Sequence, residues 1–246
     1  MKPTKTSIVS NLILGAAAAL MLGACGDKDG AEDGDNTGGS GTNDPGVGTQ
    51  GGVELTTDLP KEVIEGSPKP KGIKNLAPET KKFPKFLVPE GTVNLAKGKK
   101  VTASDDYPIL GEPELITDGE KETGEGYFLE LIEGTQWVQI DLEKSNPIYA
   151  IVMWHFHGQK RAYHDIIVQA SDDPDFKEGV TTLFNNDYDN SSKLGKGNNQ
   201  PYVESRFGQL VNGKGTKARY VRLYSNGNSA NEMNHYIEVE VFGKPE

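Results

Sequence analysis

Two histidines that stand two positions apart, His155 and His157, are the side chains best suited to chemistry. Side chains alternate along an extended strand, so the two imidazoles would leave the same face. Such a pair can bind Zn²⁺ or another transition metal if a third ligand joins it. It can equally fix sugar hydroxyls by directional hydrogen bonds, or satisfy internal hydrogen bonds. The sequence leaves these three roles open.

Other polar and aromatic side chains gather near the ends of the predicted strands. Guanidinium, imidazole and amide groups hydrogen-bond to sugar hydroxyls, and an aromatic face packs against the C–H side of a sugar ring. On this chemistry the candidate ligand-binding residues are His155, His157, Arg161, His164, Asn186, Asp187, Tyr188, Asn228, Asn234 and His235.

Residues 185–191 contain a pattern related to calcium-binding loops. Asn185, Asp187 and Asp189 place oxygen-bearing side chains at alternate positions, as the first half of such a loop does. The pattern lacks a glycine at its sixth position, and Lys196 stands at the twelfth, where a glutamate is required. We therefore favour a polar loop that satisfies its own backbone, with a Ca²⁺ loop as the alternative.

Catalytic motifs are absent from the sequence. It has no Gly-x-Ser-x-Gly elbow, no His-Glu-x-x-His, no phosphate-binding glycine loop and no cysteine within the C-terminal domain. The sequence therefore predicts that the protein is not an enzyme. A metal-dependent activity through His155 and His157 is the least favoured alternative.

The elements that must position these residues are strands. From about residue 91 onward, short runs of period two are separated by Gly, Asn and Asp, which is typical of an all-β sandwich. The clearest runs are residues 137–142, 148–156, 166–170, 220–224 and 237–242. The polar stretches 187–215 and 226–234 are predicted loops, and long loops on a strand scaffold commonly carry function.

The N-terminus resembles a bacterial lipoprotein signal. Lys2 and Lys5 precede an apolar run over residues 8–22, and small residues precede Cys25, the only cysteine. This resemblance implies a signal peptide over residues 1–24, cleavage before Cys25 and its acylation, so that lipid alone anchors the chain. The alternatives are an ordinary secretory signal or a chance cysteine. Gly26 after the cysteine favours the outer membrane of the bacterial cell envelope.

Two low-complexity segments follow the predicted anchor. Residues 25–52 are rich in Gly and Asp with few apolar side chains, so we expect a disordered, flexible tether. Residues 53–90 are rich in Pro and Lys, and prolines at that density exclude a helix or a central strand. This segment is predicted to be an extended arm, either partly docked through residues 83–88 or a disordered linker.

The charge balance excludes one class of partner. The chain carries 26 Lys and Arg against 36 Asp and Glu, a formal net charge of -10. Loss of Lys2 and Lys5 with the signal peptide makes it -12, that is, -10 minus 2. An acidic surface does not suit nucleic acid, whose binding needs clustered Lys and Arg.

Several segments in order resemble the discoidin, or coagulation factor 5/8 type C, domain family. They are residues 94–104, 116–119 with Thr123, 137–142, 163–171, 218–223 and 238–243. The resemblance implies a galactose-binding-like jelly-roll sandwich of two antiparallel sheets over residues 91–246. It also implies recognition by loops at one end and no catalytic chemistry.

The same resemblance implies a structural Ca²⁺ site. The loop after the Asp-Gly motif and a glutamate of the last strand would hold the ion, here Asp118, Glu120, Thr123 and Glu238. Ca²⁺ accepts six to eight oxygen ligands of mixed kind, so this set is chemically suitable. The alternative is a plain Asp-Gly turn with solvated acids.

These features predict a non-catalytic, surface-displayed carbohydrate-binding lipoprotein whose partner is a glycan or polysaccharide. The alternative is an envelope protein-interaction or adhesion module built on the same domain.

Overall fold

The computed structural model describes residues 52–63 and 66–246. The predicted signal peptide, Cys25 and all of the predicted tether except Gly52 lie outside the described residues. No helix in the described part of the chain is long and apolar enough to cross a bilayer.

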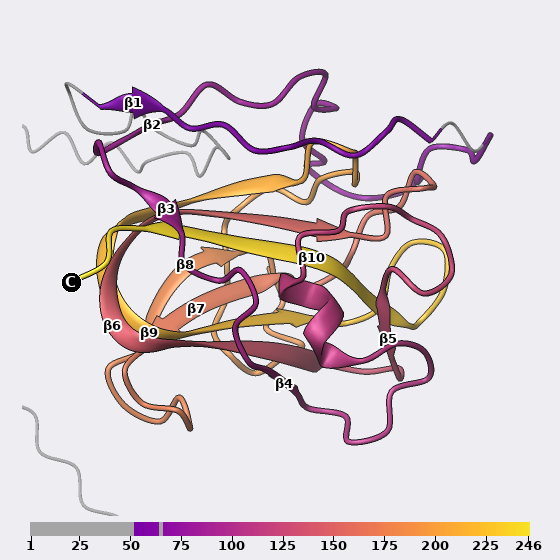
Figure 1. Ribbon diagram of the computed structural model, residues 1–246. Coiled ribbons are helices and arrows are strands. Elements are labelled where there is room, and N and C mark those ends of the chain that lie inside the picture. The colour runs from indigo at the N-terminus through magenta and orange to yellow at the C-terminus, as the bar shows by residue number, and fades with distance from the viewer. Residues whose placement is uncertain (1–51, 64–65) are drawn as a thin grey trace, which may run out of the picture. The chain divides into compact units, whose positions relative to one another are not determined.

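Strands make up nearly all of the regular structure, as predicted (Figure 1). One short 3-10 helix, η1 (Pro113–Thr117), interrupts them. The strands are β1 (Val53–Glu54), β2 (Leu87–Val88), β3 (Val93–Asn94), β4 (Val101–Ala103), β5 (Leu129–Leu131), β6 (Gln136–His155), β7 (Ile167–Ser171), β8 (Thr181–Asn185), β9 (Gln209–Ser225) and β10 (Asn234–Gly243).

Two long, bent strands join the layers of the sandwich. The first half of β6 pairs with β4 and with the end of β9, and its second half pairs with β10 and with the start of β9. β7 and β8 extend the first layer, and β3 and β5 pair with β10 in the second. Every pairing is antiparallel, which confirms the predicted antiparallel sandwich. Figure 1 shows β6 and β9 curving together at one end.

The bend explains why two predicted strands are one. Residues 137–142 and 148–156 were expected as separate strands, but both belong to β6 apart from residue 156. The register with β9 shifts between Asp141 and Asn146, and Glu143 has a φ of 68°. Left-handed backbone and an irregular register turn a strand sharply without ending it.

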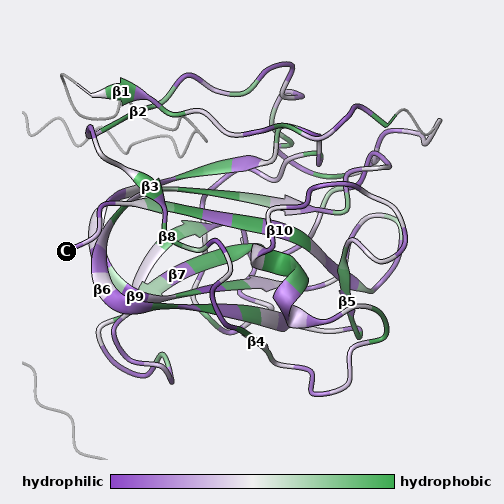
Figure 2. Cartoon of the chain, in the orientation of Figure 1, coloured by the Kyte–Doolittle hydropathy of each residue, from purple (hydrophilic) through white to green (hydrophobic). Residues whose placement is uncertain are grey.

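The main hydrophobic core lies between the layers. Buried aliphatic side chains from β6, β7, β9 and β10, among them Ile140, Ile151, Val168 and Val239, form one cluster. Figure 2 shows the hydrophobic colour following these strands, while the connecting loops are mostly hydrophilic. A core of this kind positions the strand ends rigidly, so the loops that follow them have a fixed base.

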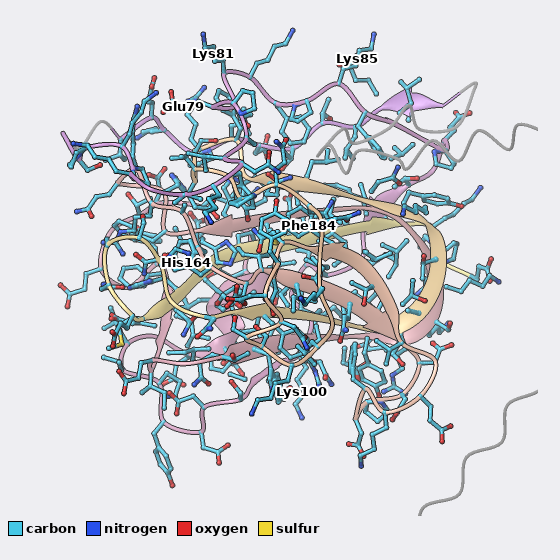
Figure 3. The ribbon with its side chains drawn as sticks, turned by 180° about the vertical axis from the view of Figure 1, so that it is seen from behind. Glu79, Lys81, Lys85, Lys100, His164 and Phe184 are labelled. Carbon is cyan, nitrogen blue, oxygen red and sulfur yellow. The ribbon has the colours of Figure 1, made fainter. Side chains whose placement is uncertain are left out.

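The proline-rich arm packs against the outer face of the second layer. Phe86 and Val88 are each 2% exposed and form a second cluster with Leu55, Trp154 and Ile237. β1 and β2 pair within the arm. Figure 3 shows Lys81 and Lys85 pointing away from the sandwich, so the arm has an apolar inner side and a charged outer side.

Candidate functional site

His164, labelled in Figure 3, lines two hollows at the loop end of the sandwich. Its backbone N–H donates to Gly227 O at 3.0 Å, and its carbonyl accepts from Asn226 N at 2.9 Å. The side chain is exposed. The backbone of residues 226–227 therefore holds an exposed imidazole at a fixed place.

The first hollow, which we call the arm-side cavity, has a volume of 330 Å³. Its walls come from the arm, from the loop after β6 and from the long loop after β8. The lining residues are Ile73, Lys74, Tyr163, His164, Asp165, Asn186, Tyr188, Asp189 and Pro201.

Three aspartates meet at this cavity. One carboxylate oxygen from each of Asp165, Asp187 and Asp189 lies within 4.8 Å of the others, and the cluster could hold a metal ion. Asp187 is fully buried, and its two oxygens accept from the backbone N–H groups of Ser191 and Ser192. Asx bonding to the loop backbone is therefore present, as the favoured sequence interpretation expected.

Asp165 and Asp189 are more accessible than Asp187. Asp165 accepts from Asn226 Nδ2 at 2.8 Å and from Ser191 Oγ at 2.7 Å, and its backbone has a φ of 51°. Hydrogen bonds from Ser191 are the main cause that lowers the pKa of Asp189. These bonds favour the charged form of the Asp189 carboxyl at the cavity wall.

Asn186 and Tyr188 add a donor and an aromatic face. Asn186 is 5% exposed; its Oδ1 accepts from Ile166 N at 2.7 Å, whereas its Nδ2 has no hydrogen-bond partner. Tyr188 is 40% exposed, and its hydroxyl accepts from Asn75 Nδ2 at 3.1 Å. Of these groups, the carboxylate acceptors and the accessible tyrosine ring are of the kinds that bind a sugar, whereas the Asn186 amide is buried beneath the cavity surface.

The second hollow lies on the other side of His164. It has a volume of 750 Å³ and is lined by Glu133, Gly134, His164 and residues 226–232. Asn228 is buried here, and its amide braces the loop by donating to Asn231 Oδ1 and Met233 O. Asn234 is fully buried, and its Oδ1 accepts internal hydrogen bonds from Ser225 Oγ and Gly227 N.

His155 and His235 belong to a buried aromatic cluster beneath the site. His155 Nδ1 lies 2.8 Å from Glu204 Oε1, and its ring stacks on Tyr163 at 4.4 Å. His235 Nδ1 lies 2.9 Å from the Tyr163 hydroxyl. Burial lowers the pKa of His235 to about 3, so the ring stays neutral. The cluster supports the floor of the loop end.

The His-x-His pair does not converge on one point. His157 Nε2 bonds to Lys121 O at 2.9 Å, and burial lowers the pKa of this imidazole. In the described part of the chain, the group of metal-ligating side chains that comes together is the aspartate cluster rather than this pair. Arg161 lies nearby, and its guanidinium donates to Gln159 Oε1. The guanidinium carbon also lies over the Phe156 ring, 4.5 Å from the ring centroid.

The residues implied as Ca²⁺ ligands lie around β10 and the turn after η1. Glu238 is fully buried, and its Oε2 accepts from Gly119 N at 3.2 Å, while Oε1 has no partner. Burial raises the pKa of Glu238 to about 9. Asp118 and Glu120 are exposed in the turn. Thr123 lies against Gly158, since a Cβ added at that glycine would be 2.9 Å from Thr123 Oγ1. The carboxylates of Asp118, Glu120 and Glu238 are not among the metal-ligating groups that come together in the described residues, although the unpartnered Oε1 of Glu238 lies buried beside this turn.

Sequence reasoning missed several lining residues. Ile73 and Lys74 were assigned only to an extended arm, and Asp165 was not selected although it follows His164 directly. No local pattern could have paired Asp165 with Asp187 and Asp189, because their proximity depends on the β7–β8 pairing. The sequence did identify His164, Asn186 and Tyr188, which the structure brings to the arm-side cavity.

Comparison with known proteins locates the family domain. The model described as F5/8 type C domain matches residues 100–239. No curated protein matches the chain.

Solved structures of similar fold include carbohydrate-binding modules. CBM32 of AlyQ, in complex with 4,5-unsaturated mannuronic acid, is 22% identical, with 58% of this chain and 93% of that chain covered and a TM-score of 0.42. Chitosan-binding module 1 of a chitosanase/glucanase from Paenibacillus sp. IK-5 is 21% identical, with 61% and 99% covered and a TM-score of 0.42. A truncated AlyQ with CBM32 and alginate lyase domains is 20% identical, with 63% of this chain covered and a TM-score of 0.45; the chain spans 34% of that protein.

Proposed function

The chain belongs to the F5/8 type C domain family, and we propose that it is a non-catalytic carbohydrate-binding protein that a lipid anchor holds at the bacterial surface. The observation that carries the proposal is the His164 site. Its two hollows open at the loop end and present carboxylates, an exposed imidazole and an exposed tyrosine ring. These groups bind hydroxyls and the apolar face of a sugar ring without any nucleophile or activated base.

The test is glycan binding by the full chain carrying Cys25→Ser, which is expected to be soluble. Affinity electrophoresis against neutral, amino and uronic polysaccharides should retard the protein with at least one class. Tyr188→Ala should weaken binding by up to about tenfold, because the contact of an aromatic face contributes on the order of 0.5–1.5 kcal/mol beyond the area that it buries. Tyr107→Ala is the matched control at another exposed tyrosine. Absence of binding to every polymer would refute the proposal.

We further propose a structural Ca²⁺ at Asp118, Glu120, Thr123 and Glu238. The unpartnered Oε1 of buried Glu238 supports it, because Ca²⁺ would satisfy this oxygen and favour the ionised carboxylate. Thermal unfolding with added Ca²⁺ should occur at a higher temperature than with chelator. Equal melting temperatures would count against the ion.

The lipid anchor and the envelope location are proposed on the N-terminal sequence. Cys25→Ser should move the protein from the membrane fraction to the soluble fraction while its melting temperature stays unchanged. Retention of the variant in membranes would refute anchoring through Cys25.

A role in binding an envelope protein is the second candidate. It is favoured by an exposed apolar patch of Tyr107, Ile109 and Ile132, which are 88%, 53% and 45% exposed. Ile109 N donates to Glu130 O at 2.8 Å, so this loop runs beside β5. Cross-linking in cells should capture a partner through Tyr107 if this candidate holds, and Tyr107→Ser with Ile109→Ser should abolish the capture.

A further inference from the structure

One half of the arm is strongly basic on an otherwise acidic protein. Residues 66–89 carry six lysines and one glutamate, a net charge of +5 from six minus one. Residues 101–246 carry 13 basic and 24 acidic side chains, a net charge of -11 from 13 minus 24. The preceding residues 53–63 hold three acids and one lysine. The positive charge is therefore confined to one short stretch of the chain.

Most of these lysines face water. The five that we call the outer lysines are exposed, and they are Lys69, Lys71, Lys81, Lys82 and Lys85. The sixth, Lys74, lines the arm-side cavity. Figure 3 shows Lys81 and Lys85 pointing away from the sandwich. Within the described residues, the ion pairs of the arm leave Lys71, Lys81 and Lys82 without a carboxylate partner.

Nearby acids do not cancel this charge. Glu79, the one acid of residues 66–89, is shared by two lysines, with Oε2 at 2.9 Å from Lys69 Nζ and Oε1 at 3.0 Å from Lys160 Nζ. Lys85 Nζ lies 3.9 Å from Glu54 Oε2, and these side chains are 74% and 55% exposed, so water screens the pair. The outer side of this stretch thus keeps a net positive charge.

The outer lysines present charge without a shaped binding site. The apolar side chains of the same stretch point inward, since Phe86 and Val88 are buried against the sandwich. Residues 66–89 contain no arginine, the side chain that binds one carboxylate or phosphate through two parallel hydrogen bonds. Ammonium groups on flexible stems suit a broad layer of negative charge rather than one molecule held in a fixed pose.

We propose that the outer lysines contact the anionic headgroups of a bilayer and so orient the domain on the membrane that carries it. The choice of a bilayer rests on the proposed lipid anchor. Val53 follows Cys25 by 28 positions, so anionic lipid is a polyanion that the arm of an anchored chain can reach. The arm lies outside the matched family domain, so this contact is separate from the loop-end site.

The charge asymmetry gives the contact a direction. An anionic surface attracts the outer lysines and repels the acidic domain, which favours an orientation with the arm toward the lipid. Exposed charges are screened within about 8 Å at physiological salt, so the arm alone holds the chain weakly. The anchor supplies the attachment, and the lysines supply the orientation.

Vesicle co-sedimentation of the full chain carrying Cys25→Ser tests the arm without acyl chains. The vesicles contain phosphatidylcholine alone, or phosphatidylcholine with about 30% phosphatidylglycerol as the anionic lipid. We expect binding to the anionic vesicles only at about 20 mM salt, and its loss at about 500 mM salt.

Removing three outer lysines should weaken this binding strongly. Each lysine near an anionic surface strengthens binding about fivefold, so Lys81→Gln with Lys82→Gln and Lys85→Gln should weaken it about a hundredfold. The melting temperature of the triple variant, compared with that of the parent, separates loss of binding from loss of fold.

A matched triple variant controls for net charge. Lys144→Gln with Lys196→Gln and Lys214→Gln removes the same charge from exposed lysines of the domain, and its affinity should stay close to that of the parent. Equal weakening by the two triple variants would overturn the proposal, because net charge alone would then determine binding.

Two further results would also overturn the proposal. The first is absence of binding to the anionic vesicles at low salt. The second is binding to soluble polygalacturonate that depends on the outer lysines and is tighter than binding to vesicles of equal total charge, which would assign these lysines to an acidic polysaccharide. Glycan binding at the His164 site and release of the Cys25→Ser chain from cell membranes are measured separately, so failure of either proposed function is distinguishable from failure here.

Discussion

Asn234 illustrates how one side chain holds the loop end together. Its Oδ1 accepts from Ser225 Oγ at 2.7 Å and Gly227 N at 2.8 Å, and its Nδ2 donates to Ile132 O and Gly134 O. Asn234→Ala would leave several buried groups unsatisfied and should lower the free energy of unfolding by about 2–4 kcal/mol. Urea denaturation measures this, with exposed Asn198→Ala as a control within about 0.5 kcal/mol of the parent.

Glu238 makes stability depend on pH in the absence of a cation. Burial raises its folded-state pKa to about 9 from 4.5, so the folded chain disfavours the charged form. Its contribution to stability is full below the unfolded pKa, and it is lost as pH rises from about 4.5 through about 9.

Melting temperatures of the chelated protein should therefore fall across that range. Glu238→Gln should flatten the profile and remove stabilisation by Ca²⁺. A parent protein whose chelated profile is already flat would contradict this account of Glu238.

Residue type alone could not separate ligand-binding side chains from internal braces. His164 and Tyr188 are exposed at the cavity, but Asn228, Asn234 and His235 have the same chemistry and are buried. The difference depends on what lies across each loop, and a single sequence does not contain that information. Strand-end position correctly located the region, because loops at strand ends gather at one end of a sandwich.

The loop that carries the proposed cation ligands also fastens the arm. Lys121 Nζ bonds to Glu240 Oε1 at 2.9 Å and donates to Asp58 O at 3.1 Å, with Lys121 and Glu240 6% and 7% exposed. Lys121→Met would leave the buried carboxylate of Glu240 without its cation and should lower the free energy of unfolding by about 3–5 kcal/mol. Lys121→Met combined with Glu240→Leu should recover most of the loss, and a double-mutant cycle in urea checks it. Additive losses would show that the ion pair is not coupled.

Strand periodicity predicted the location of the strands but not their continuity. The apolar alternation in residues 137–142 and 148–156 was visible in the sequence. The left-handed Glu143 in the middle of β6 was not, because nothing local distinguishes a bend from a hairpin turn. Both halves of β6 pair with β9, so the two runs form one continuous, bent strand.

The molecule as a whole depends on its arm. Leu55, Phe86 and Val88 cover Trp154 and Ile237 on the outer sheet face, and each buried apolar side chain contributes about 1.5–3 kcal/mol. A fragment that begins at Gly91 should therefore unfold at much lower urea concentration than one that begins at Gly52, and it should bind a dye specific for exposed apolar surface. Equal urea midpoints for the two fragments would show that the arm does not stabilise the domain.

The site, too, belongs to the whole molecule rather than to the matched domain. The arm-side cavity joins residues near 74, 164, 187 and 201, which no spacing in the sequence relates. Sequence reasoning identified the side chains that lie on predicted strand ends. It could not identify those of the arm, because an extended, proline-rich segment contains no periodicity that states which surface it meets.

Sharing β6 and β9 between both layers also constrains how the chain can fold. Gln136 pairs with Ser225 and Met153 with Gln209, so neither layer can close until the chain is nearly complete. Pairings so distant in sequence raise the contact order, and β-sandwiches of this kind fold in about milliseconds to seconds. We therefore expect a single slow refolding phase in stopped-flow fluorescence, with no faster step that belongs to one layer alone.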